Sequence, residues 1–269
     1  MEDMDIPETK DDLFFILKRG TTMMNAIAAL ADRSFNPSAF AMIQVGKPGL
    51  DITVHVTHPQ TDKQVFGFLR LKAAGLHEFV CEKPFTKLVS LLSIHNILKD
   101  ATDNNDTDYI AVYVVSGTNR LCFAWGQITR YSGVPEKSVG LYNLKSEYAT
   151  FPDVSYGFEA VIASTTWNNA IQQLLQIDPH TRSTRGWVTM TAATVEMELR
   201  QGLVVSTEEN PELHDVWMDW KYWESLHKAL RLTDKCSMYL VTDPPEHIMF
   251  RFKLQELGDL FYLTGTQHV

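Results

Sequence analysis

Apolar and polar positions alternate along this chain with two different periods. Most segments show the alternating or continuously apolar pattern of β-strands, bounded by glycine, proline or charged turns. These segments are 13–20, 39–46, 51–57, 64–73, 77–83, 109–115, 120–129, 138–144, 156–164, 186–192, 195–201, 202–208, 214–220, 236–242, 247–255 and 258–265. The pattern therefore predicts a protein built mainly of strands.

Four segments have helical spacing instead. Residues 21–30 and 165–174 each offer a threonine as a cap, followed by apolar residues spaced for one helix face. Residues 87–101 place five leucine or isoleucine side chains at helical positions, and residues 219–234 place Trp220 and Trp223 on one side. We therefore predict four helices among the strands.

The segment TTMMNAIAAL at 21–30 is repeated as TTWNNAIQQL at 165–174, with six of ten positions identical. Each copy follows a strand, and the order strand, helix, four strands, helix, three strands occurs twice. A period of roughly 130 to 145 residues is too long for a solenoid repeat and fits two copies of one domain. We predict domains at 1–144 and 156–269, joined by a polar connector at 145–155. Few helices and many antiparallel strands indicate an α+β fold, with the helices on one face of the sheet.

The composition, with 45% hydrophobic residues in 269, is that of a folded globular protein. The sequence has no apolar run long enough for a membrane span, and its acidic start, MEDMDIPETKDD, lacks the order of a secretory signal. We expect an intracellular protein without a membrane partner. Cys81, Cys122 and Cys236 are isolated and are expected to be reduced core thiols.

No catalytic or metal-binding pattern stands out. His55 and His58 are three apart on a predicted strand, so they should point to opposite faces. Residues 103–108, DNNDTD, resemble the start of a calcium loop but lack its glycine and its terminal glutamate. Phosphate-binding and nucleophile motifs are missing as well. We expect no enzyme activity, no catalytic residues, no metal and no cofactor.

The net charge of −9 argues against a protein that grips nucleic acid with a broad basic surface. Such binding depends on many lysines and arginines that displace counterions. If DNA is a partner, its retention must depend on something other than charge.

Four segments, taken in order, resemble the proliferating cell nuclear antigen (PCNA) family of DNA sliding clamps. They are LHEFVCEKPFTKLVSLLSIHNILKDA, EYATFPDVSYGFEAVI, WKYWESLHKAL and HIMFRFKLQELGDLFYLTG, and the resemblance extends over about residues 13–264. It implies a sliding-clamp fold of two tandem domains per chain and a ring, usually a homotrimer, whose helices line a channel around duplex DNA. A closed ring is held on DNA by topology, which reconciles DNA binding with the acidic charge.

The resemblance also implies a function. Clamps of this family tether DNA polymerase and other replication and repair proteins as processivity factors, with a clamp loader as a further candidate partner. The corresponding location is the nucleus or an intracellular site of viral genome replication.

Several basic residues match the DNA-facing positions of the family. Lys221, Lys228 and Arg231 share one stripe of the fourth predicted helix because their spacing is seven and three. Lys99 ends the second helix. Weaker candidates are Lys83 and Lys87. The alternative for each is an ordinary solvated surface.

The first and third predicted helices depart from the family because they contain no lysine or arginine. Their exposed faces offer amides such as Asn25 and Asn169. Amides can bond phosphate but release no counterions, so we expect DNA contact that is weaker and less sensitive to salt.

The family binds partner peptides in a groove beside the connector. The matching positions are His55, Ala149, Phe151, Pro152, His247, Tyr262, Leu263 and Thr264. For Phe151 and Tyr262 the alternative is plain core packing. After Leu263 the family typically continues with alanine and proline, whereas this chain has Thr264 and Gly265, and the loss of the proline is expected to loosen the tail.

The subunits of such rings meet by edge-to-edge strand pairing. The matching residues are Leu141 and Tyr142 on one edge and Leu203 and Val204 on the other. Their alternative is an internal position in the sheet.

Three rival functions stay open. The neutral first and third helices also fit a subunit of a heterotrimeric checkpoint clamp or a monomeric viral processivity factor of the same fold. A metal-dependent hydrolase on a duplicated α+β core is the rival from another class.

Overall fold

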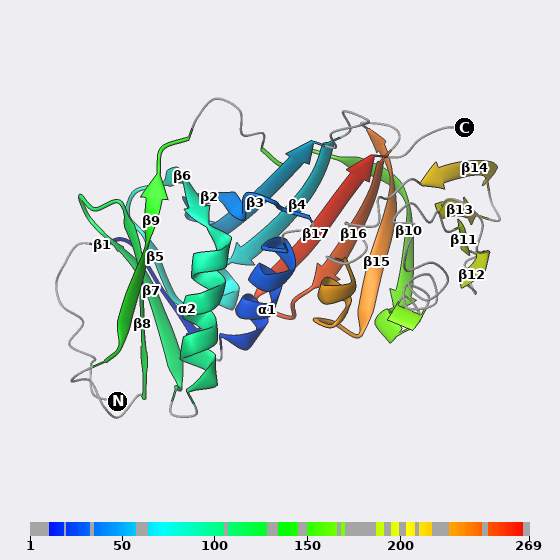
Figure 1. Cartoon of the computed structure of the whole chain (residues 1–269). Coiled ribbons are helices and arrows are strands. Elements are labelled where there is room, and N and C mark those ends of the chain that lie inside the picture. The colour runs from blue at the N-terminus through cyan, green and yellow to red at the C-terminus, as the bar shows by residue number, and fades with distance from the viewer. Residues whose placement is uncertain are drawn as a thin grey trace.

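The computed structural model describes residues 11–18, 20–32, 35–57, 64–104, 107–127, 134–144, 150–165, 168–169, 187–190, 195–198, 203–207, 210–216, 226–243 and 247–265. Within these ranges the chain is an α+β protein with mostly antiparallel strands and few helices, and its large sheet does not close into a barrel (Figure 1). The predicted α+β class is confirmed.

Among its described residues, the first half contains nine strands, two helices and one short 3-10 turn. In chain order they are β1 (Asp11–Lys18), α1 (Thr21–Leu30), β2 (Phe40–Gly46), β3 (Gly49–Thr57), β4 (Gln64–Lys72), η1 (Ala73–Gly75), β5 (His77–Cys81), β6 (Phe85–Ser90), α2 (Leu91–Asp103), β7 (Tyr109–Val115), β8 (Arg120–Gly126) and β9 (Glu136–Tyr142).

The described strands of the second half are β10 (Ser155–Ala163), β11 (Trp187–Met190), β12 (Val195–Glu198), β13 (Leu203–Thr207), β14 (Asn210–Val216), β15 (Lys235–Asp243), β16 (His247–Lys253) and β17 (Gly258–Gly265). Residues 164–165, 168–169 and 226–230 are helical. The helix predicted over 219–234 ends at residue 230, because residues 231–234 form a turn and bends. The other residues of the two helices predicted in this half lie outside the described residues.

Three other local predictions are wrong. The helix predicted for 87–101 begins only at Leu91, because Leu88 and Val89 belong to β6 and pair with β2. Ser90 caps α2 by accepting a hydrogen bond from the backbone N–H of Ser93 at 3.3 Å. A threonine does not cap α1, since its N-cap is Gly20. The strand predicted at 214–220 is β14, which begins earlier because it forms a hairpin with β13.

The described strands form a main sheet of thirteen in the order β10-β15-β16-β17-β4-β3-β2-β6-β9-β8-β7-β1-β5. The order β1-β7-β8-β9 in the first half matches β10-β15-β16-β17 in the second, and helical residues follow the first strand of each set. Strand β17 pairs with β4 over seven residue pairs, so the sheet is continuous across the two halves. Strands β11 to β14 form two separate hairpins.

The main core lies between the sheet and its helices. Helices α1 and α2 lie side by side over one face (Figure 1), which we call the helical face. Met23, Ala26, Ile27 and Leu30 of α1 are buried there, as their spacing predicts. A Cβ atom on Gly67 of β4 would lie 2.5 Å from the Leu30 side chain, so the absence of a side chain at this position lets α1 pack closely on the sheet.

The helical residues 226–230 join the same core. Leu226 and Leu230 belong to the buried cluster that contains α1 and α2. Residues from both halves therefore contribute to one apolar core on the helical face.

The cysteines form no disulfide. Cys122 and Cys236 are buried, and Cys81 is half-buried. Burial raises the pKa of the Cys236 thiol, which keeps it protonated and unreactive. In the part of the chain that the structure describes, no helix has the length and apolar character that crossing a bilayer requires.

Candidate functional site

The helical face carries several of the predicted DNA-facing residues. Asn25 on α1 and Lys99 on α2 are exposed, and so are Lys228 and Arg231 near the helical residues 226–230. Asn169 is exposed in its helical segment, and Lys221 lies outside the described residues.

Lys228 joins the two halves of the chain. Its ammonium donates a hydrogen bond to the carboxylate of Asp32, which follows α1 directly and has 7% of its side chain exposed. The Lys228 side chain stays 48% exposed. Arg231 contacts the ring of His227 through its guanidinium at 2.9 Å. Asp32 therefore offsets part of the positive charge that Lys228 brings to this face.

Lys83 and Lys87 are not on helices. Lys83 lies in the turn between β5 and β6 and forms an ion pair with Asp12 at 3.4 Å. Lys87 is on β6 and donates a hydrogen bond to the side-chain oxygen of Asn143 at 2.7 Å. Both side chains are thus engaged with neighbouring strands or loops.

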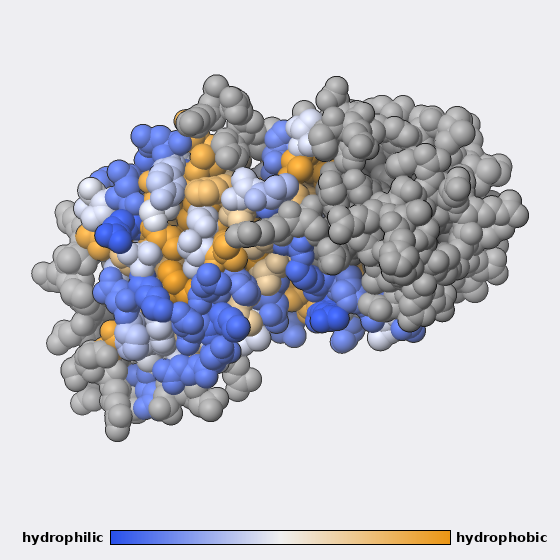
Figure 2. Space-filling view, viewed as in Figure 1, coloured by the Kyte–Doolittle hydropathy of each residue, from blue (hydrophilic) through white to orange (hydrophobic). Residues whose placement is uncertain are grey.

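The charge of the helical face is nearly balanced among the described residues. Lys99, Lys228 and Arg231 supply positive charge, while α2 also exposes Asp100 and Asp103. Figure 2, which views this face, shows hydrophilic residues along the lower border and an apolar patch above them. The face does not carry a dense basic surface.

The opposite face of the sheet, which we call the outer face, carries a cluster of aromatic residues. Phe66, Tyr239, Val241, Met249 and Leu263 form its buried layer, and Phe151, Val154 and Phe261 pack on this layer. The ring of Phe151 stacks on Phe68 with 4.6 Å between centroids and meets Phe66 edge-on at 6.0 Å. These ring contacts therefore pack the connector segment around Phe151 against β4.

The strand register explains why these rings meet. Phe68 of β4 is paired with Phe261 of β17, and in the next row Phe66 is paired with Leu263. Residues two apart on a strand share a face, so both rows project outward beneath Phe151. The outer face thus combines strands of both halves.

Three of the predicted groove residues, His55, Phe151 and Leu263, belong to this cluster or stack on it. Phe151 and Pro152 are half-buried, and Leu263 is fully buried within it. Thr264 ends the pairing of β17 with β4, and His247 begins β16. Ala149 lies outside the described residues.

Tyr262 does not lie on the aromatic cluster. Its side chain is 3% exposed in the main core, where its ring lies 5.5 Å from Phe35 and 6.2 Å from Phe252. Because neighbouring strand residues point to opposite faces, Tyr262 cannot share the groove with Leu263. The groove assignment of Tyr262 is wrong, and the alternative of core packing is correct.

His55 on β3 lies at the edge of the aromatic cluster. Its ring stacks on Phe66 with 4.7 Å between centroids. Its Nε2 atom is buried and has no hydrogen-bond partner. Burial lowers the pKa of His55, so the ring is neutral near pH 7.

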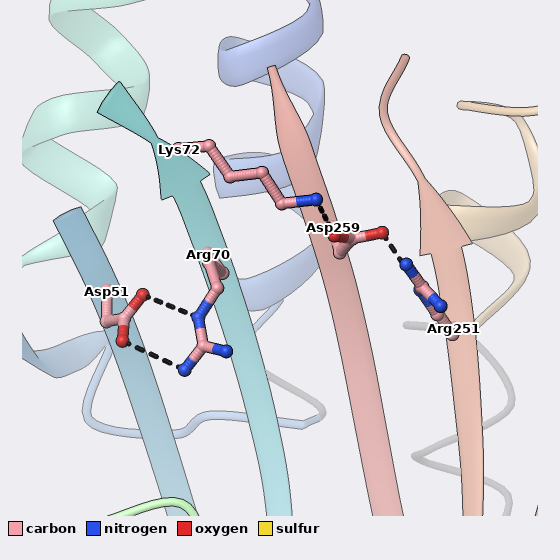
Figure 3. Close-up of polar contacts among 5 residues, drawn as sticks. All are labelled: Asp51, Arg70, Lys72, Arg251 and Asp259. Carbon is pink, nitrogen blue, oxygen red and sulfur yellow. Dashed lines mark hydrogen bonds and ion pairs between the residues drawn. The ribbon is translucent and has the colours of Figure 1, made fainter. Parts of the chain in front are cut away.

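A ladder of ion pairs crosses the outer face at one end of the aromatic cluster (Figure 3). Arg70 on β4 binds both carboxylate oxygens of Asp51 on β3, at 3.2 and 3.3 Å. Asp259 on β17 accepts from Lys72 at 3.0 Å and from Arg251 on β16 at 2.9 Å. We call Asp51, Arg70, Lys72, Asp259 and Arg251 the charge ladder.

The carboxylate of Asp259 is the central group of the ladder. Burial alone would raise its pKa, but hydrogen bonds from Arg251 and Lys72 outweigh burial and lower it. Asp259 is therefore ionised at neutral pH.

The sequence analysis missed the charge ladder. A signal was present, because Phe66, Phe68, Arg70 and Lys72 alternate along β4 and so share one face. Their partners Asp51, Asp259 and Arg251 come from three other strands, and only the register brings them together.

The residues predicted for the subunit contact lie on paired strands. Strand β9 pairs with β8 over five residue pairs and with β6 only through Leu141 and Tyr142. Leu141 is buried, whereas Tyr142 is 54% exposed. Leu203 and Val204 lie on β13 and pair with β14.

An open hollow of about 590 Å³ lies between α2 and β9, beside the short pairing with β6. Its lining includes Ser93, Asn96, Arg120, Lys137 and Tyr142. Within the described ranges, no group of three or more His, Cys, Asp or Glu side chains could hold a metal ion.

Comparison with known proteins does not identify a family. No protein-family model matches the chain, and no curated protein matches it.

Proposed function

We propose that the chain is a DNA sliding clamp of the PCNA type, a processivity factor without chemistry of its own. The observation that supports this best is the repeated strand order, β1-β7-β8-β9 and β10-β15-β16-β17, in one continuous sheet. Its described helices pack on one face, and the connector residue Phe151 packs on the other. A ring needs this separation, because one face must line a channel while the other remains open to partners.

The strands β9 and β17 support a closed assembly. They hold equivalent places in the two halves, and β17 pairs with β4 over seven residue pairs. Along one edge of β9, residues 136–140 pair with β8. Along its other edge, only the last two residues of β9 pair with β6. We propose that β13 of a second copy pairs with this edge, which would place Leu141 and Tyr142 near Leu203 and Val204 in a homotrimer.

In this proposal the helical face surrounds duplex DNA. Asn25, Lys99, Lys228 and Arg231 are exposed there and would meet phosphates. Few cations suffice, because a closed ring stays on DNA by topology and not by affinity. A bound polymerase then stays at high local concentration near the primer end.

The test is retention on DNA of defined topology. Protein is incubated with a linear duplex fixed to a bead at one end, the free end is then blocked with a bulky bound protein, and the beads are washed at high salt. A ring that has threaded onto the duplex resists the wash only when the end is blocked, and cutting the duplex releases it. Retention that is unaffected by blocking and cutting would falsify the proposal.

Primer extension on circular DNA tests the tethering role. A DNA polymerase that binds the chain should make longer products in its presence, with a clamp loader added in a parallel series. Equal product lengths with and without the protein, in both series, would contradict a processivity role.

The nearly balanced charge of the helical face also favours a second candidate, a monomeric processivity factor or a checkpoint-type clamp subunit of the same fold. Such a protein would act on DNA as a monomer, or in a ring with different partner chains, and not as a ring of three identical chains. Mass measurement in solution separates the candidates, since a homotrimer has three chain masses and the rival is a monomer at micromolar concentration.

A further inference from the structure

We propose that the charge ladder and the adjoining aromatic cluster form one docking surface for a partner peptide that carries an apolar anchor and acidic residues. This inference rests on the proposed tethering function and adds the chemistry of the partner. It concerns the outer face, where strands of both halves meet.

Two of the three cations of the ladder are about half exposed, whereas its central carboxylate, Asp259, is buried. The side chains of Arg70, Lys72 and Arg251 are 52%, 48% and 33% exposed, whereas Asp259 is 4% and Asp51 is 30% exposed. Lys253 of β16 is exposed beside them and is paired in register with Asp259. A ligand approaching the outer face therefore meets cations first, on a chain whose net charge is −9.

The two arginines are held in place before any ligand binds. The guanidinium of Arg70 donates two hydrogen bonds to the carboxylate of Asp51 and lies 4.9 Å from the centroid of the Phe68 ring. Arg251 lies 5.8 Å from the centroid of Phe261 while it donates to Asp259. Groups that are already ordered lose little entropy on binding, which favours a recognition role.

The apolar part of the surface begins in the next row of the sheet. Phe261 is paired with Phe68, and Phe151 packs over both of them. Phe151, Pro152 and Phe261 keep partial exposure above a fully packed layer. Arginine and aromatic side chains in this arrangement are typical of protein-binding surfaces.

The spacing of the cations suits separate carboxylates better than one phosphate. Arg70 on β4 and Arg251 on β16 are separated by β17, so their strands are about 10 Å apart. Asp259 lies between them and would repel a phosphate centred there. An extended peptide can place one acidic side chain near each cation and its apolar anchor beside Phe151.

The experiment compares two fluorescent peptides by polarisation with the full chain. Both carry the same pair of phenylalanines, flanked in one peptide by glutamates and in the other by lysines. We expect the acidic peptide to bind at least about tenfold more tightly and to weaken with salt, as several partly exposed charge contacts require. Equal binding of the two peptides, or no binding of the acidic one, overturns the proposal.

Matched double variants locate the site. Lys72→Gln with Lys253→Gln removes two exposed cations from the outer face but leaves both arginines in their pairs with Asp51 and Asp259. Lys83→Gln with Lys137→Gln removes the same charge elsewhere and serves as the control. The first variant should weaken acidic-peptide binding about tenfold and the control should not, given the usual size of such contacts. Equal weakening by both variants overturns the assignment.

A single-stranded oligonucleotide tests the rival ligand class. If it competes with the acidic peptide and is weakened by the same Lys72 and Lys253 changes, the surface is a general polyanion site and the peptide proposal is wrong. DNA retention after end blocking reports the clamp function separately. Retention without acidic-peptide binding contradicts the docking surface alone, and acidic-peptide binding without retention contradicts the clamp alone.

Discussion

The helical and outer faces of the shared sheet are made by the same strands, but only the outer face carries the charge ladder beside its aromatic cluster. On β4 and β17 the helical face receives Leu69, Leu71 and Leu260, all fully buried. The outer face receives Arg70 and Asp259 from the same strands. One side of the sheet is thus built for packing against helices, and the other exposes charges and rings.

This difference shows how an antiparallel sheet separates stability from recognition. Side chains alternate between faces, so each strand can supply the core at every second position and a surface at the others. Five predictions follow from this separation, and they are ordered from the largest expected effect to the smallest.

The largest effect is expected from truncating a ring on the helical face. Phe252 of β16 is fully buried there, so Phe252→Ala should lower the free energy of unfolding by about 3–5 kcal/mol. Phe261 on the outer face keeps partial exposure, and Phe261→Ala should cost only about 1–2 kcal/mol. Urea unfolding measures both. Equal losses would mean that the outer face carries as much of the core as the helical face.

Removing the charge of Asp259 should have the next largest effect. Asp259→Asn leaves Lys72 and Arg251 without their shared carboxylate and should cost about 2 kcal/mol near pH 7. Urea unfolding measures the loss, and the matched control is Asp103→Asn, an exposed acid on α2 that should change stability little. A loss no larger than that of the control would show that the ladder adds nothing to stability.

The same variant should change the pH dependence of stability. The pKa of Asp259 is lowered in the folded chain, so its contribution is present above the unfolded value of about 3.9 and is lost as pH falls through the folded value. The stability difference between the native chain and Asp259→Asn should therefore shrink in acid. A difference that stays constant down to the acid transition contradicts the lowered pKa.

A smaller effect is expected from adding a cation to the helical face. Asn25→Lys places a charge on the exposed side of α1, and each new phosphate contact should steepen the slope of log affinity against log salt by about 0.9. Gln44→Lys adds the same charge at an exposed position of β2, on the outer side of the sheet, and is the control. Anisotropy of labelled duplex DNA at several salt concentrations measures both slopes. Equal changes in the two salt slopes would show that the helical face contacts DNA no more than the outer face does.

The smallest effect concerns His55. Burial lowers its pKa in the folded chain, so the unfolded chain takes up the proton first as pH falls. Stability should therefore decrease slightly as pH falls below the unfolded pKa of about 6.5, and the effect is small because the ring is only partly buried and solvent screens its charge. His55→Gln should remove this part of the pH dependence in urea unfolding. An unchanged pH profile in the variant would contradict the assignment to His55.

The sequence predicted much of the fold because strand and helix periods are local. The apolar spacing of α1 was read correctly, since Met23, Ala26, Ile27 and Leu30 are buried as expected. The start of α2 was misplaced because Leu88 and Val89 fit either a helix or a buried strand, and pairing with β2 decided between them.

The outer face was predicted only in part. The resemblance to known clamps assigns Phe151 to one groove with Leu263, and the structure packs Phe151 on the cluster that contains Leu263. Tyr262 was assigned to the same groove, although its neighbour Leu263 occupies that face. The strand range alone did not fix which of the two side chains points outward.

The order of residues along the chain by itself determined the α+β class, the repeated ten-residue segment and most strand positions, because these depend on spacing between near neighbours. Tertiary structure decided which strands are adjacent. The pairing of β17 with β4 put Asp259 between Lys72 and Arg251 and brought Phe261 beneath Phe151. These contacts join residues from distant parts of the chain, and their geometry depends on the register of a sheet that forms only when both halves fold together.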